Sequence, residues 1–184
     1  MGRKKRVSKG KQMKPNFFVF CEGKTEMTYV KFLRSKYRVP IQVIPRKGKT
    51  NISKDDIERS TRDYVGTDQD KVFLMFDLDV EGTLRHLKTI SDAELLVSNP
   101  CIELWFLLHY QDQKPKLTSE TCLKKLLKHS KGYKKGSLSD EEKQVLATKV
   151  DTATTRAKSM KEYENPSTSV YHLIDLLMKY LETS

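Results

Sequence analysis

The 184-residue sequence lacks several features that would place it in a common class. No apolar run approaches the roughly 20 residues that a membrane span needs. The charged N-terminus has no hydrophobic segment of the kind found in secretory signals. Its three cysteines, Cys21, Cys101 and Cys122, have no metal-binding spacing and cannot all pair. We therefore expect a cytoplasmic protein with reduced thiols and no membrane association.

Two ligand-binding signatures are incomplete. Gly23-Lys24-Thr25 and Gly48-Lys49-Thr50 look like the end of a phosphate-binding P-loop, but Phe18 and Val43 stand where the motif needs its first glycine. This excludes a nucleoside triphosphate site of that type. The four histidines share no ligand spacing, so the pattern does not favour zinc. We expect His109, within an apolar helix, to be a hydrogen-bonded core residue.

Positive charge is concentrated at the N-terminus. Of the formal net charge of +11, seven positive charges and no acid lie before residue 15, which leaves +4 for the rest. Residues 1–15 are therefore expected to form a disordered basic arm. Such an arm suits a polyanion, with nucleic acid as the first candidate partner. A solubilising tail is the alternative.

The hydrophobic pattern predicts a single α/β domain over residues 16–184. The expected strands are Asn16–Cys21, Ile41–Ile44, Val72–Phe76 and Glu94–Val97. The expected helices are Thr25–Tyr37, Thr83–Ile90, Cys101–Tyr110, Ser119–His129, Ser139–Tyr163 and Thr168–Leu181. A further helix is expected to begin after a cap at Asn51 or Ser53 and to reach about Tyr64. Because strands alternate with helices, we predict a four-stranded, mostly parallel sheet flanked by helices. A helical C-terminal part begins at about residue 117.

Acidic residues follow two of the predicted strands. Glu22 ends the first strand, Gly23 permits a tight turn, and Glu26 falls on the inward stripe of the next helix. Asp77 and Asp79 follow the third strand at i, i+2, so they point the same way if the chain stays extended. Clustered carboxylates need a cation, and oxygen ligands favour Mg²⁺ or Mn²⁺. For Glu26 alone, stabilisation by the helix dipole is an alternative explanation.

Glu103 is the single acid of the apolar segment 101–110, which we expect Asn99 to cap and Pro100 to begin. Burying an unpaired charge costs several kcal/mol. Glu103 should therefore bind a metal or a cationic side chain, or form a structural ion pair.

Basic residues in the turns are candidate contacts to nucleic acid. The alternative is that these side chains merely face solvent. The candidates are Lys24 beside the first acids, Arg46, Lys47 and Lys49 in the loop after the second strand, and Lys134 and Lys135 with Tyr133 in a glycine-flanked loop.

Four motifs in order resemble known proteins. Glu22-Gly23 after a strand, with Asp77-x-Asp79 after a later one, resembles the Toprim domain of topoisomerases, primases and OLD-type nucleases. Together with 98–105 (SNPCIELW) and 165–168 (NPST), the chain is similar to the RloB family of bacterial defence-associated proteins over about 16–181. The resemblance implies a Toprim-like, Rossmann-like fold and metal-dependent cleavage of phosphodiester bonds.

The resemblance also implies residue roles. Glu22, Glu26, Asp77 and Asp79 would bind the metal, with Glu22 also a candidate general base. OLD-type sites add a serine and an acid, for which Ser98 and Glu103 are the nearest matches, although their spacing departs from that pattern. OLD-type sites also use a lysine near the end of the domain. The first candidate for this lysine is Lys158, followed by Lys149 and Arg156, and Arg156 is also a candidate nucleic-acid contact. The alternative is that all three side chains merely lie on a solvent-facing side of a helix.

We therefore expect a Mg²⁺-dependent (or Mn²⁺-dependent) endonuclease that acts on RNA such as tRNA, or on DNA, in antiphage defence. The alternative is a non-catalytic nucleic-acid-binding or sensor subunit with a Toprim shell. A partner protein from the same defence system is possible under either reading, and the chain is expected to be a monomer or a homodimer.

Overall fold

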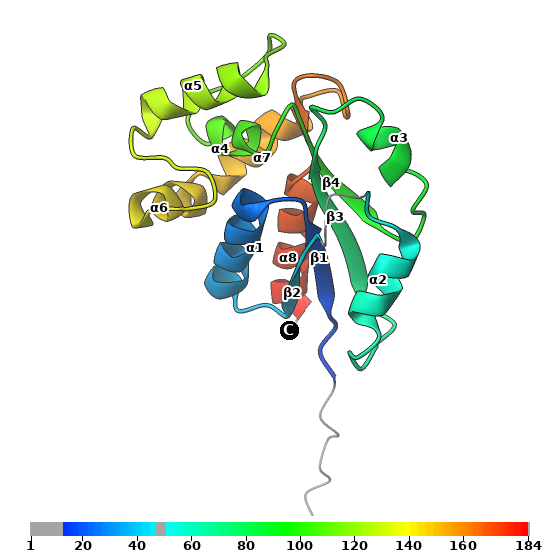
Figure 1. Cartoon of the computed structure of the whole chain (residues 1–184). Coiled ribbons are helices and arrows are strands. Elements are labelled where there is room, and N and C mark those ends of the chain that lie inside the picture. Colours follow the sequence, from blue (N-terminus) through cyan, green and yellow to red (C-terminus); the bar gives the residue numbers. More distant parts are fainter. Residues whose placement is uncertain (1–12, 47–50, 184) are drawn as a thin grey trace, which may run out of the picture.

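A five-stranded sheet forms the centre of the molecule (Figure 1). The structure is a computed structural model that describes residues 13–46 and 51–183. The strand order is β2-β1-β3-β4-β5, and the first four strands run parallel. Their bounds are β1 (Phe17–Cys21), β2 (Ile41–Pro45), β3 (Lys71–Asp77), β4 (Glu94–Asn99) and β5 (Ser167–Thr168). The α/β class and the mostly parallel sheet are thus confirmed.

The predicted number of four strands is wrong, because β5 adds a short antiparallel strand at one edge. Ser98 and Asn99 of β4 pair with Thr168 and Ser167 of β5. Next to this pair, the hydroxyl of Ser169 accepts a hydrogen bond from the backbone N–H of β4 at 2.9 Å. Two residues are too few to show strand periodicity in a sequence, so this element was missed.

Helices cover both faces of the sheet (Figure 1). One face packs against α1 (Lys24–Tyr37) and α8 (Tyr171–Thr183), and the other against α2 (Lys54–Thr61) and α3 (Thr83–Leu87). Every residue of β1 is buried, with alternate side chains entering the two cores. The continuous apolar runs therefore reflect burial on both faces of a parallel sheet, as predicted.

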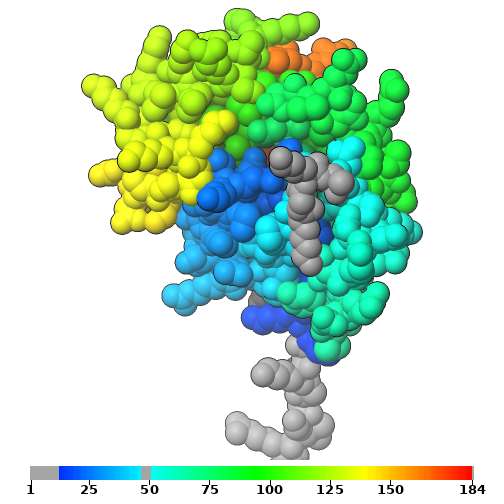
Figure 2. Space-filling view, in the orientation of Figure 1, coloured from blue at the N-terminus to red at the C-terminus, as the bar shows by residue number. Residues whose placement is uncertain are grey.

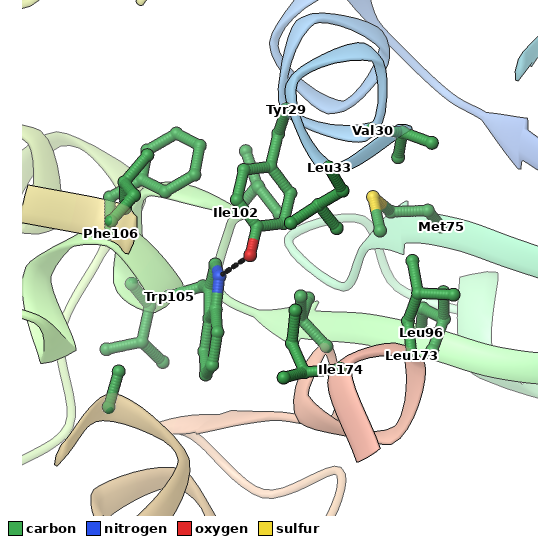
Figure 3. Close-up of a cluster of buried hydrophobic side chains, with 14 of the residues drawn as sticks. Tyr29, Val30, Leu33, Met75, Leu96, Ile102, Trp105, Phe106, Leu173 and Ile174 are labelled. Carbon is green, nitrogen blue, oxygen red and sulfur yellow. Dashed lines mark hydrogen bonds between the residues drawn. The ribbon is translucent and has the colours of Figure 1, made fainter. Parts of the chain in front are cut away.

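The helical C-terminal part packs around a short buried helix. Its elements are α4 (Glu103–Leu108), α5 (Ser119–His129), α6 (Asp140–Thr148) and α7 (Val150–Lys158). Trp105 of α4 is fully buried and donates a hydrogen bond to the hydroxyl of Tyr29 at 2.7 Å (Figure 3). His109, also buried, donates a ring hydrogen bond to the carbonyl of Trp105, which confirms its prediction as a core histidine. The α5 and α6 region forms a lobe beside α1 (Figure 2).

Several predicted boundaries need correction. The helix predicted over 139–163 is two helices, α6 and α7, because the backbone leaves helical geometry at Lys149 (φ −109°, ψ 16°). Asn99 does not cap α4, because it belongs to β4 and its side-chain amide donates to the carbonyl of Tyr163. The helix starts after Ile102 instead.

Within 13–46 and 51–183, no helix is long and apolar enough to pass through a bilayer. Most of the predicted basic arm (1–12) lies outside the described residues, and residues 13–16 have no regular secondary structure. Lys47 and Lys49 also lie outside the described residues.

Candidate functional site

The first predicted acids meet where β1 and β3 end. Glu22 directly follows β1, and its Oε2 accepts a hydrogen bond from the backbone N–H of Asp77 at 3.1 Å. Its Oε1 lies 3.3 Å from Nη1 of Arg46. Both partners are themselves at strand ends, since Asp77 closes β3 and Arg46 follows β2. The carboxyl edge of the sheet therefore brings Glu22, Asp77 and one of the predicted cations together.

Glu26 lies in the first turn of α1 and is buried, which confirms its predicted inward position. A Cβ atom placed on Gly23 would come within 2.9 Å of Oε2 of Glu26. The backbone of Gly23 is extended (φ −133°, ψ −175°), a conformation open to any residue. A side chain at position 23 would therefore shift the flexible Glu26 carboxylate, whereas the backbone conformation at this position does not itself need a glycine.

Asp77 connects the strand edge to α4. Its Oδ1 accepts a hydrogen bond of 2.8 Å from the backbone N–H of Ile102, the residue before α4. Burial raises the pKa of Asp77 to about 9, and the negative charges of Glu26 and Glu103 contribute to this rise. Burial likewise raises the pKa of Glu26, with Glu103 and Glu22 adding to it. The four carboxylates thus share one electrostatic environment that has too little positive charge.

Glu103 is 1% exposed and has partners on only one of its oxygens. Its Oε1 accepts a hydrogen bond of 3.0 Å from the hydroxyl of Tyr133 and lies 3.5 Å from Nζ of Lys135. Its Oε2 is buried and has no hydrogen-bond partner among the described residues. The predicted cationic partner is thus present, as a lysine, while half of the carboxylate remains unsatisfied.

The loop between α5 and α6 carries both partners of Glu103, and it is fixed on α1. The backbone N–H of Gly136 donates to Oγ1 of Thr25 at 2.9 Å, and its carbonyl accepts from Oγ1 of Thr28 at 3.0 Å. Gly136 has φ +77°, and a Cβ there would lie 3.0 Å from Cβ of Lys24. A side chain at this position would therefore be strained and crowded. The sequence marked this loop as a candidate phosphate contact but gave no sign that Tyr133 binds Glu103.

Asp79 is separated from the other acids by its contacts. It is exposed, and its closest polar contact is Oγ of Ser119 at 3.5 Å. It lines a hollow of about 490 Å³ together with Leu78, Asn99, Pro100, Leu117, Thr118, Ser119, Glu120 and Asn165. The strand β3 ends at Asp77, although the backbone N–H of Leu78 still donates a hydrogen bond to the carbonyl of Ser98 in β4. The two aspartates therefore contact different segments, Asp77 the start of α4 and Asp79 the start of α5.

The remaining predicted residues make other side-chain contacts or face solvent, although Ser98 is the strand-register partner of Asp77 in the sheet. The buried hydroxyl of Ser98 shares a hydrogen bond of 2.9 Å with that of Thr168. Lys158 forms an ion pair of 2.7 Å with Asp175 of α8, and Arg156 donates to the carbonyl of Leu108. In the described chain, these three side chains make no hydrogen bond or ion pair with the acids of the site. Lys149 lies over a tyrosine ring, and Lys24 and Lys134 are exposed.

The carboxylate oxygens of the site are suitable ligands for a hard divalent cation, but the described side chains do not form a complete coordination shell. Carboxylate oxygens are the ligands that Mg²⁺ and Mn²⁺ prefer, and the unsatisfied Oε2 of Glu103 is such a donor. Burial, and then the charges of neighbouring acids, raise the pKa values of Glu26 and Asp77, so their carboxylate forms are unfavourable without a cation. Among residues 13–46 and 51–183, however, no three His, Cys, Asp or Glu side chains already surround one metal position.

Comparison with known proteins identifies the family. The family model described as RloB-like protein matches residues 17–177, from the start of β1 into α8. No curated protein and no solved structure matches the chain. The matched region includes the four acids and the loop that contacts Glu103. Because the match covers most of the sequence, the chain belongs to the RloB-like family.

Proposed function

We propose that the protein is a divalent-metal-dependent nuclease that hydrolyses phosphodiester bonds. The observation that carries this proposal is the buried Oε2 of Glu103, which has no hydrogen-bond partner in residues 13–46 and 51–183 and shares its electrostatic environment with three further carboxylates. A buried anion in this state is costly. A divalent cation would remove the cost, and phosphodiester hydrolysis is the chemistry for which such carboxylate sites are suited.

Glu22, Asp77 and Glu103 would hold the cation, which when bound would polarise the phosphate and make the attacking water more acidic. Asp77 would lose its proton as the cation binds, because the cation favours the carboxylate form. Glu26 is the better candidate to accept a proton from water at Oε2, since a raised pKa makes a carboxylate a stronger base. Glu22 is the second candidate for this role. Arg46, 3.3 Å from Glu22, would orient that carboxylate and would contact a substrate phosphate.

The substrate is proposed to be RNA, such as tRNA, or DNA, and the biological role to be antiphage defence. The net charge of +11 supports a polyanionic substrate. The small domain favours a structured RNA recognised by its backbone and shape. The Toprim resemblance and the defence association come from the motifs shared with the RloB family. A partner protein from the same system would restrain the activity, which would be toxic if constant.

The test is incubation of the purified protein with total RNA and with plasmid DNA, each with Mg²⁺, Mn²⁺ or EDTA. We expect cleavage of one substrate class with a divalent cation and none with EDTA. Asp77→Ala should abolish cleavage without unfolding the protein. Asp175→Asn is the matched control, because Asp175 of α8 forms its ion pair with Lys158 of α7. Undiminished cleavage by the double variant Glu22→Ala/Asp77→Ala would overturn the site assignment.

The second candidate is a non-catalytic nucleic-acid-binding or sensor subunit. Two observations favour it: the described acids do not already surround one metal position, and Asp79 contacts α5 instead of the other carboxylates. This function predicts nucleic-acid binding that weakens steeply as salt rises. It also predicts no cleavage of either substrate with any divalent ion.

A further inference from the structure

The ion pair between Lys135 and Glu103 joins a surface lysine to a fully buried acid. The Glu103 side chain is 1% exposed, whereas that of Lys135 is 56% exposed. An exposed pair contributes little to stability, but a buried carboxylate that loses its partner is costly. Lys135 therefore neutralises a buried acid while more than half of its own side chain stays exposed. Burial alone would lower the pKa of Lys135, but the charge of Glu103 raises it, so the lysine is a full positive charge at neutral pH.

Both partners of Glu103 use the same oxygen. Tyr133 and Lys135 contact Oε1, and Oε2 has no partner within the described chain. Two other acids, Glu26 and Asp77, feel the charge of Glu103. The unsatisfied oxygen is therefore available to a cation that the other carboxylates would share, without displacing the tyrosine.

The loop holds the lysine at this place from both sides. Two residues before Lys135, the buried Tyr133 is fixed by its bond to Glu103. On its other side, Gly136 is bonded to Thr25 and Thr28 of α1. The backbone of Lys135 is thus fixed at the rim of the acid site, and only its four-carbon side chain is free to change its contact.

We propose that Lys135 is an exchangeable counter-ion: it neutralises Glu103 when the acid site holds no divalent cation, and it contacts a phosphate of bound nucleic acid when a cation takes that role. This inference rests on the proposed function and adds a residue that couples cation binding to substrate binding. A divalent cation on Oε2 repels the ammonium on Oε1 of the same carboxylate. A substrate phosphate at the rim then offers the lysine a new acceptor.

Exchange of this kind makes two measurable predictions for Lys135→Met, which removes the charge and keeps an unbranched stem. Without the competing ammonium, Mn²⁺ should bind about two- to fivefold more tightly, the range expected for one ion pair near the surface. Nucleic-acid affinity should fall about two- to fivefold when Mn²⁺ is present and stay unchanged in EDTA. A lysine that merely faces solvent would give the same small loss with and without Mn²⁺.

The experiment uses the full chain and two separate titrations. Mn²⁺ binding is measured by the paramagnetic signal of the free ion. RNA binding is measured by fluorescence anisotropy of a labelled 20-nucleotide phosphorothioate strand that resists cleavage, with Mn²⁺ or with EDTA. Lys134→Met is the matched control, because it removes the same charge from the adjacent exposed position of the loop. It should leave Mn²⁺ affinity within experimental error of the wild type.

The outcomes separate this inference from the proposed function. If the wild type and Lys135→Met bind Mn²⁺ equally well, or if the loss of RNA affinity is the same in EDTA, the exchange is refuted while the metal site stands. If neither protein binds Mn²⁺, both proposals fail. Lys135→Gln retains a donor for Oε1 of Glu103 and replaces the methionine variant if that variant unfolds. Lys135→Arg keeps the charge and should have wild-type Mn²⁺ affinity.

Discussion

Replacing Asp77 with asparagine should stabilise the cation-free protein. The folded state raises the pKa of Asp77 from its ordinary value of 3.8 to about 9, chiefly through burial and then through Glu26 and Glu103. At neutral pH Asp77 is therefore protonated in the folded protein, whereas it is ionised in the unfolded chain. Asparagine imitates the protonated form, and its Oδ1 can still accept the hydrogen bond from the N–H of Ile102.

The size and direction of the effect follow from proton linkage. Below pH 3.8 both states are protonated and Asp77 makes no difference. Between pH 3.8 and about 9, the unfolded chain has lost this proton and the folded chain retains it, so stability falls by up to about 1.4 kcal/mol per pH unit. The upper limit at pH 7 is about 4 kcal/mol. Because Asp77 is partly exposed, solvent screens the interaction, and we expect Asp77→Asn to stabilise by about 1–2 kcal/mol.

The assay is urea unfolding in EDTA at pH 5, 7 and 8.5. The advantage of Asp77→Asn over the wild type should grow from pH 5 to pH 8.5. Adding Mn²⁺ should reverse the order, because the cation stabilises the wild-type carboxylate more than the amide. Asp63→Asn, at an exposed position after α2, is the control and should show no such trend. A variant that is no more stable than the wild type at pH 8.5 in EDTA would refute the electrostatic reasoning.

Three further substitutions test other parts of the site. Gly23→Ala should slow Mn²⁺-dependent cleavage, because its Cβ would lie 2.9 Å from Oε2 of Glu26 and shift the carboxylate that we propose as the proton acceptor; a wild-type cleavage rate would contradict this role of Glu26. Tyr133→Phe should destabilise by about 1–3 kcal/mol in urea unfolding, since a buried carboxylate loses a donor, and a neutral result would mean that the hydroxyl is replaced by water. Ser98→Ala should cost about 1 kcal/mol of stability through its lost bond to Thr168 and leave Mn²⁺ affinity unchanged, whereas weaker Mn²⁺ binding would restore the predicted ligand role.

The elements of the sheet were predictable because burial on two faces leaves a strong signal. The runs that form β1 and β3 are continuously apolar, and the inward phase of Glu26 followed from its spacing to Tyr29 and Leu33 on α1. Both signals depend only on the hydrophobic periodicity within a single helix or strand. The same local reasoning placed Glu22 and Asp77 at one edge, because parallel neighbours end on the same side.

The partners of Glu103 could not be found in this way. Tyr133 lies 30 residues further along the chain, and the contact arises from the path of α5 and its following loop. Nothing in the spacing of the lysines distinguishes Lys135, which pairs with Glu103, from Lys158, which pairs with an aspartate of α8. For Asp79, nothing in the sequence indicated its contact with Ser119, which lies 40 residues further along the chain at the start of α5.

The attachment of the α5–α6 loop to α1 also affects how the protein is made. Gly136 bonds to Thr25 across 111 positions of the sequence, and the bond between Gly136 and Thr28 spans 108. During synthesis the acids of β1, α1 and β3 leave the ribosome long before the lysine and tyrosine that complete their surroundings. A nascent chain therefore cannot assemble the mature acid site until roughly three quarters of the domain has emerged. Any activity of the site is thus delayed, by the order of the sequence itself, until the α5–α6 loop has been made.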